Sequence, residues 1–129
     1  MDPADLKPLP LFSTLDRREL ERVARWADEI EVEEGRPVVN RGEFAFEFFV
    51  IIDGEAEVVR GQEHLRDLGP GDFFGELALV ETDRRTASVV AKTPMRLAVM
   101  LGRDFREMED EMPHVARRVT AAIEERRGT

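Results

Sequence analysis

The chain has no cysteine, no long apolar run and no surplus of basic residues. Without cysteine it cannot form disulfides, bind zinc through thiolates or use a thiol as a nucleophile. No apolar run approaches the ~20 residues that span a bilayer, and Met1–Asp5 lacks the basic and apolar regions of a signal peptide. We therefore expect a cytoplasmic protein that has no membrane partner.

The acidic balance limits the partners further. The formal net charge is -9 at pH 7, and a surface of that sign repels the nucleic-acid backbone. We therefore expect no nucleic-acid partner, although a small anion can bind where arginines and backbone amides reverse the local field. The length of 129 residues fits one domain, residues 1–129.

The N-terminal part predicts a short amphipathic helix. Asp16 and Glu19 have the spacing of a capping box, so we expect the helix to begin just after Asp16. Apolar residues then recur with helical spacing on one face: Leu20, Val23, Ala24 and Ala27.

The middle of the chain, about residues 30–100, predicts many short strands. Glycines punctuate β-rich runs such as 48–52 and 87–91. Asp53-Gly54 between two such runs predicts a two-residue hairpin of type I′, which needs positive φ at both central residues. Short strands with frequent turn residues predict an antiparallel jelly-roll β-barrel.

The helical period returns after Gly102. Phe105, Met108 and Met112 lie on one face, and Pro113 suits the first turn of a second helix. The predicted fold class is α+β, mainly β, with an N-terminal helix and two C-terminal helices over about 103–127. The second helix has an apolar stripe that packs either on the barrel or on a second copy in a homodimer: Val115, Val119, Ala122 and Ile123.

The segment that follows Gly71 carries the groups that bind an anionic sugar. Gly75 allows a close backbone approach, and the N–H groups of residues 77–79 can face an anion at the start of a helical turn. Arg85 offers a planar fork for phosphate oxygens, and Glu76 is an acceptor for sugar hydroxyls. These groups predict a ribose phosphate site. The alternative is that Arg85 pairs with Glu76 or Asp83 on a solvated face.

The same segment resembles a known cassette. Residues 74–79 read Phe-Gly-Glu-Leu-Ala-Leu, and five residues later Arg85-Thr86-Ala87 follow. This pattern resembles the phosphate-binding cassette of the cyclic-nucleotide-binding domain family, which includes the N-terminal domain of catabolite activator protein and the regulatory subunit of protein kinase A. The resemblance extends to barrel glycines such as Gly35 and Gly54 and covers nearly the whole chain.

The resemblance implies a role for each cassette residue. Glu76 would accept a hydrogen bond from the ribose 2′-hydroxyl, while Arg85 and the backbone N–H of Ala78 would hold the cyclic phosphate. Thr86 would lie beside the phosphate and the base. The remaining cassette residues implied in ligand binding are Gly75, Leu77 and Ala87.

The resemblance also implies where the base lies. An apolar pocket would be formed by Val58, Leu65, Leu68 and Phe74. For each of these four residues the alternative is ordinary barrel core. Arg126, near the end of the last helix, is the implied lid residue.

These observations predict a sensor domain that binds cyclic AMP or cyclic GMP and regulates an unknown effector protein. We expect no catalysis, cofactor or DNA-binding domain. His64 and His114 lie far apart with no carboxylates clustered near them, so we expect no metal site. The alternative is an interaction module of the same fold that has lost nucleotide binding. The choice between cyclic AMP and cyclic GMP stays open.

Overall fold

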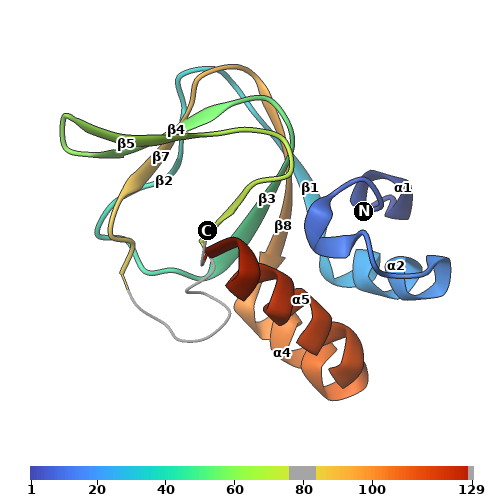
Figure 1. The fold of residues 1–129 in the computed structure, drawn as a ribbon. Coiled ribbons are helices and arrows are strands. Elements are labelled where there is room, and N and C mark those ends of the chain that lie inside the picture. Colours follow the sequence, from blue (N-terminus) through green and yellow to red (C-terminus); the bar gives the residue numbers. More distant parts are fainter. Residues whose placement is uncertain (76–83, 128–129) are drawn as a thin grey trace.

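Two antiparallel four-stranded sheets form the centre of the molecule, in a computed structural model that describes residues 1–75 and 84–127 (Figure 1). One sheet has the strand order β1-β8-β3-β6 and the other the order β2-β7-β4-β5. The strands are β1 (Asp28–Val32), β2 (Pro37–Val39), β3 (Glu47–Asp53), β4 (Ala56–Arg60), β5 (Glu63–Leu68), β6 (Phe73–Phe74), β7 (Ser88–Ala91) and β8 (Met95–Leu101).

Helices lie at both ends of the chain. They are α1 (Pro3–Leu6), η1 (Pro10–Phe12), α2 (Arg17–Val23), η2 (Ala24–Trp26), α4 (Gly102–Glu111) and α5 (Pro113–Arg127). This arrangement confirms the predicted antiparallel jelly roll with an N-terminal helix and two C-terminal helices. None of the helices in the described ranges is both long and apolar enough to cross a membrane.

Strand β3 separates two hydrophobic cores. Alternate residues of a strand point to opposite faces, and here both faces are covered. Phe48 and Val50 belong to the core shared with the helices, whereas Phe49 and Ile51 belong to the core between the sheets. Adjacent residues of β3 therefore contact two different cores.

The predicted hairpin at Asp53-Gly54 was wrong. β3 pairs with β8 and β6, whereas β4 pairs with β5 and β7, so the chain crosses from one sheet to the other here. Gly54 has φ +96°, and no non-glycine residue in the described part has positive φ. A Cβ at Gly54 would lie 2.4 Å from the carbonyl oxygen of Pro94. The glycine therefore permits close contact with the turn before β8 rather than a type I′ hairpin.

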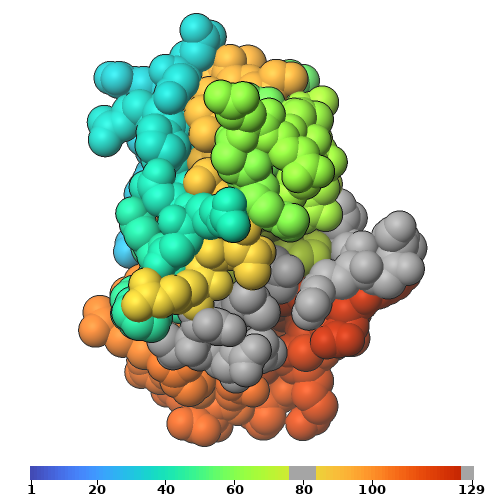
Figure 2. All heavy atoms as spheres, turned by 90° about the vertical axis from the view of Figure 1, so that its left-hand side faces the viewer, coloured from blue at the N-terminus to red at the C-terminus, as the bar shows by residue number. Residues whose placement is uncertain are grey.

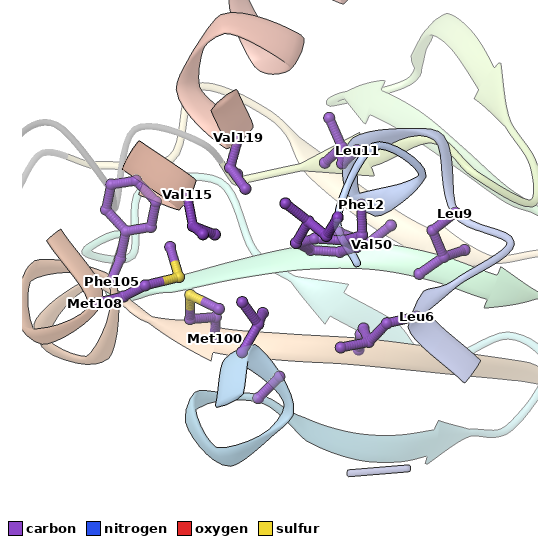
Figure 3. Close-up of a cluster of buried hydrophobic side chains, with 14 of the residues drawn as sticks. Leu6, Leu9, Leu11, Phe12, Val50, Met100, Phe105, Met108, Val115 and Val119 are labelled. Atoms are coloured by element: carbon purple, nitrogen blue, oxygen red, sulfur yellow. The ribbon is translucent and has the colours of Figure 1, made fainter. Parts of the chain in front are cut away.

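The terminal helices share one core. Figure 3 shows Val115 and Val119 of α5 facing the same cluster as Phe12 and Met100. Val115, Val119 and Ile123 are buried within this chain, and Ala122 is partly buried against the cluster. Of the two packings predicted for the α5 stripe, the structure therefore shows the one inside the chain.

A polar cluster joins the start of α5 to the N-terminal segment. The predicted capping box is confirmed, because Asp16 and Glu19 each accept from the other's backbone N–H at 2.9 Å. The second carboxylate oxygen of Glu19 accepts from Arg118 and lies 3.2 Å from His114 Nε2. Arg118 also donates to the Thr14 carbonyl oxygen at 3.2 Å. The hydrogen bond that Glu19 accepts from the Asp16 backbone N–H holds the pKa of Glu19 below its usual range, although desolvation acts in the opposite direction. The Arg118 and His114 side chains lower this pKa further.

We expect Glu19→Gln to lower the free energy of unfolding by about 1.5–3 kcal/mol at neutral pH, the range for hydrogen bonds to charged groups. A carboxyl group whose pKa is lower in the folded state stabilises the fold at pH values above its pKa in the unfolded chain, which is about 4.3. The difference between wild type and variant should therefore shrink as the pH falls through the lower, folded-state pKa.

Urea unfolding at several pH values measures this difference. Glu21→Gln is the matched control, because among the described residues Glu21 pairs only with the exposed Arg17 one helical turn away. Its cost should be about 0.3–0.5 kcal/mol. Equal costs for the two variants would show that the Glu19 cluster does not stabilise α5.

Candidate functional site

A cavity of about 130 Å³ lies between the two sheets, where β6 ends. It is lined by Val39, Val58, Arg66, Phe74, Gly75, Arg85, Thr86, Ala87 and Val89. In Figure 2 the yellow residues that follow the grey segment lie below the teal residues and the green β4–β5 hairpin. The cavity therefore brings together the start and the end of the predicted cassette.

Arg85 is the one buried charged side chain in the part of the chain that the structure describes, with 8% of its surface exposed. Its Nη2 donates to the carbonyl oxygen of Glu47 at 2.9 Å. Its backbone N–H donates to the Glu43 carbonyl oxygen, and its own carbonyl oxygen accepts from the Gly42 N–H. Both the main chain and the guanidinium are thus held by the segment that leads into β3. This burial rules out a position of Arg85 on a solvated face.

Gly75 lies against the Arg85 guanidinium. Its φ is +81°, a conformation that L side chains rarely adopt. A Cβ at this position would lie 2.5 Å from Arg85 Nη1 and 2.6 Å from the Glu47 carbonyl oxygen. Glycine is therefore required here both by the backbone conformation and by the close approach of the arginine.

Two aromatic pairs lie on opposite sides of β3 and β6. Phe74 lines the cavity and stacks on Phe49, with ring centroids 4.8 Å apart and planes 15° apart. Phe73 faces the helices and packs on Phe48, with ring centroids 5.8 Å apart. The wall of the cavity is therefore connected through two adjacent residues to the core that contains α5.

Only part of the predicted base pocket lines the cavity. Val58 and Phe74 do, but Leu65 and Leu68 do not. A bulge in the β4–β5 ladder leaves Leu65 without a partner and 36% exposed, because Val58 pairs with Arg66 and Val59 with His64. Leu68 pairs with Ala56 and lies in the core between the sheets.

Four predicted residues cannot be placed. Glu76, Leu77 and Ala78 lie outside the described residues. Arg126 belongs to α5, but its side chain also lies outside the described part. Their roles stay predictions.

The sequence reasoning missed three residues of the cavity wall: Val39, Arg66 and Val89. Val89 could have been found, since it lies two residues after Ala87 and alternate residues of an extended chain share a face. Arg66 lies directly opposite Val58 in the ladder. Finding it required the register of the β4–β5 hairpin, which the bulge shifts.

Arg84 and Arg85 face opposite ways, as neighbours in an extended segment do. Arg84 is exposed and donates to the Gly42 carbonyl oxygen at 2.7 Å. Its guanidinium lies 4.3 Å from the ring centroid of Phe44, which is itself half exposed. Arg84 is therefore a surface residue outside the cavity wall.

The prediction that no carboxylates cluster near the histidines was wrong. His64 Nδ1 lies 2.9 Å from Glu57 and its Nε2 lies 3.7 Å from Asp67, because the hairpin places these residues side by side. Lys92 also pairs with Asp67 at 3.3 Å. The cluster is exposed on the face of the hairpin opposite Val58, so it takes no part in the cavity.

Two larger hollows lie elsewhere on the described surface. One, of about 580 Å³, lies between α1 and α2 and is lined by residues such as Pro3 and Leu20. The other, of about 620 Å³, is bordered by acidic residues including Glu31 and Glu33. Neither contains a buried cation, so the smaller cavity at Arg85 is the better candidate for an anionic ligand.

Comparison with known proteins shows the family to which the chain belongs. The family model described as "Cyclic nucleotide-binding domain" matches residues 29–111. A cAMP-dependent protein kinase regulatory subunit of Schizosaccharomyces pombe is 38% identical over 94 residues, which cover 72% of this chain and 23% of that protein. The chain spans about a quarter to a third of the curated relatives that it matches.

Solved structures show the same fold. The catabolite activator protein of Thermus thermophilus superposes with a TM-score of 0.79 at 24% identity, over 91% of this chain and 57% of that one. The regulatory subunit of a cAMP-independent protein kinase A from Trypanosoma brucei superposes with a TM-score of 0.82 at 26% identity, over 98% of this chain and 44% of that one.

Proposed function

Because the chain belongs to the cyclic nucleotide-binding domain family, we propose that the cavity at Arg85 binds cyclic AMP or cyclic GMP and that residues 1–129 form one sensor domain without catalysis. The observation that carries the proposal is the buried Arg85 guanidinium in the wall of a cavity. In a protein with a net charge of -9, such a cation supplies the attraction that a small anion needs.

The proposed roles follow the cassette. Arg85 and the Ala78 N–H hold the cyclic phosphate, and Glu76 accepts from the ribose 2′-hydroxyl. Thr86, which lines the cavity, is proposed to lie beside the phosphate and the base. Val58 and Phe74 contact the base. Leu77, Gly75 and Ala87 shape the backbone around the phosphate, and Arg126 covers the base from α5.

The fold offers a route from ligand to effector. Phe74 lines the cavity, and the adjacent Phe73 lies in the same buried cluster as Ile123 of α5. A ligand that shifts β6 would therefore also change the packing of α5, provided that it binds the two arrangements differently. With the α5 stripe buried inside the chain, a homodimer through this helix needs another of its faces.

A second function keeps the fold without the nucleotide. The similar kinase subunit from Trypanosoma brucei is described as belonging to a cAMP-independent enzyme. In that case Arg85 would hold the Glu47 carbonyl oxygen as part of the fold alone. Nucleotide binding separates the two proposals.

Titration calorimetry with cyclic AMP and cyclic GMP tests the proposed function. The non-cyclic 5′-AMP and 5′-GMP are the controls, since they carry the same bases with a second phosphate charge. We expect saturable one-site binding of at least one cyclic nucleotide and weaker binding of its non-cyclic counterpart. No heat from either cyclic nucleotide at millimolar concentration would favour the interaction module.

The Glu76 role gives a separate prediction. A hydrogen bond from a ribose hydroxyl to a carboxylate contributes about 1.5–3 kcal/mol. The wild type should therefore bind a 2′-deoxy cyclic nucleotide more weakly than the ribo form by roughly 10- to 150-fold. Glu76→Ala should remove most of this preference. The four affinities form a double-mutant cycle, and a coupling energy near zero would exclude contact between Glu76 and the ribose.

A further inference from the structure

A histidine and two carboxylates meet on the face of the β4–β5 hairpin that points away from the cavity. One ring nitrogen of His64, one oxygen of Glu57 and one oxygen of Asp67 all lie within 4.8 Å of one another. His64 Nδ1 is 2.9 Å from the Glu57 oxygen, and His64 Nε2 is 3.7 Å from Asp67 Oδ1. We call these three side chains the hairpin cluster. Imidazole and carboxylate together are a common set of zinc ligands.

The bulge between β4 and β5 brings the histidine onto this face. Glu57 and Asp67 are partners in the ladder, so their side chains share one face of the hairpin. In a regular strand His64, three residues before Asp67, would point to the opposite face. The bulge leaves Leu65 without a partner and pairs His64 with Val59, which shares the face of Glu57. The irregularity therefore adds an imidazole to the two carboxylates, and bulges often re-aim a side chain in this way next to functional sites.

The spacing of the three donors suits a metal ion. Ligand atoms at about 2.0–2.2 Å from a tetrahedral zinc ion are roughly 3.3–3.6 Å apart, and those of the hairpin cluster lie within 4.8 Å of one another. The exposed fractions of the side chains are 49% for His64, 34% for Glu57 and 60% for Asp67. Small rotations of these side chains can therefore bring the donors onto an ion while the strands keep their register.

A lysine lies where the cation would bind. Lys92, which directly follows β7, places its Nζ 3.3 Å from Asp67 Oδ1. The same oxygen faces His64 Nε2. A metal ion that binds Asp67 must displace this ammonium group, because two cations cannot share one carboxylate oxygen at close range without strong repulsion. Lys92 is therefore a competitor of the metal, and removing it should strengthen metal binding.

We propose that Glu57, His64 and Asp67 bind one divalent transition-metal ion, with Zn²⁺ as the ion that suits their mixed nitrogen and oxygen donors. The imidazole disfavours Mg²⁺ and Ca²⁺, which prefer oxygen ligands. Three protein ligands leave one position of a tetrahedral ion open. The ion joins β4 to β5 on the face opposite Val58. This proposal replaces the expectation from the sequence that the chain has no metal site, and it does not depend on the proposed function.

Calorimetric titration of the nucleotide-free protein with zinc chloride tests the proposal. The wild type should bind one Zn²⁺ per chain at micromolar concentrations and Mg²⁺ far more weakly. His64→Ala should weaken zinc binding by at least about 10-fold, since even the loss of an outer-shell partner costs 10- to 100-fold. His114→Ala is the matched control, because His114 is the other histidine of the sequence and pairs with a single carboxylate among the described residues, Glu19. It should keep the wild-type affinity.

A second pair of variants separates a site from general attraction to an acidic protein. Lys92→Ala should tighten zinc binding by about 2- to 5-fold, the factor that corresponds to a surface ion pair. Arg60→Ala removes the same charge from the end of β4, outside the hairpin cluster, and should leave the affinity nearly unchanged. Both titrations belong at about 0.15 M salt, where distant charges are largely screened.

Thermal unfolding gives an independent measurement. Zn²⁺ should raise the melting temperature of the wild type and of His114→Ala but not that of His64→Ala, because an ion that binds the folded chain stabilises it. The proposal is wrong if the wild type shows no saturable zinc binding, or if His64→Ala binds as tightly as the wild type. Equal affinities for Zn²⁺ and Mg²⁺, or equal effects of Lys92→Ala and Arg60→Ala, would show that the acidic surface attracts cations without a site.

Discussion

Arg85→Ala is expected to abolish binding of every cyclic nucleotide, whatever its base. The cyclic phosphate carries a full negative charge and loses water when it enters the cavity. Removing one partner of a desolvated charge pair costs about 2–5 kcal/mol, or roughly 30- to several-thousand-fold in affinity. The loss should be large here, because Arg85 is 8% exposed and the protein's net charge is -9.

The adjacent arginine provides the matched control. Arg84→Ala changes the net charge by the same amount, but Arg84 is exposed and stacks on Phe44 outside the cavity wall. It should keep affinity within a few-fold of wild type. Arg85→Lys should recover only part of the affinity, because an ammonium cannot reproduce the planar fork.

Titration calorimetry on variants shown to be folded by circular dichroism measures these effects. Equal losses for Arg84→Ala and Arg85→Ala would reduce the role of Arg85 to net charge. Retained binding in a folded Arg85→Ala variant would show that the cavity at Arg85 is not the nucleotide-binding site.

Gly75→Ala adds a single methyl group to the site, and it is expected to lower both the stability of the fold and the affinity for the ligand. Holding a non-glycine residue at φ +81° costs about 1–2 kcal/mol. The new Cβ would also overlap Arg85 Nη1 and the Glu47 carbonyl oxygen, and overpacking of this kind adds about 1–3 kcal/mol. The two terms predict a loss of about 2–5 kcal/mol in the free energy of unfolding. Ligand affinity should fall as well, because the Arg85 guanidinium must move.

Gly35→Ala isolates the two causes. Gly35 has φ +85°, but a Cβ there would have no atom within 4 Å. Its cost should be the conformational one alone, about 1–2 kcal/mol, without loss of ligand affinity. Urea unfolding and calorimetry of both variants give the comparison. If Gly75→Ala is no worse than Gly35→Ala, the close approach to Arg85 does not matter.

The helices could be predicted from local signals. The capping box at Asp16 and Glu19 and the helix start at Pro113 depend on residues a few positions apart, and both are confirmed. Asp53-Gly54 carries a local signal of the same kind, yet the hairpin is absent. Its neighbours β3 and β4 take their partners from β8 and β7, far away in the chain, and no local pattern reports such pairing.

The same difference between local patterns and pairing of distant residues applies to the candidate site. Gly75, Arg85 and Thr86 were predicted because the cassette is a contiguous pattern, and they line the cavity. Arg66 was missed and Leu65 was expected in its place. The bulge that leaves Leu65 unpaired shifts the register of β5 against β4. The position of a residue across a bulged ladder depends on the partner strand, which the sequence of β5 alone does not contain.

The most direct test of the central claim is a crystal structure of the protein grown with a saturating concentration of whichever cyclic nucleotide, cyclic AMP or cyclic GMP, binds more tightly in the titration. The account predicts phosphate oxygens within hydrogen-bond distance of the Arg85 guanidinium, with the base beside Val58 and Phe74. A nucleotide in the hollow between α1 and α2, or a cavity at Arg85 without nucleotide, would contradict it.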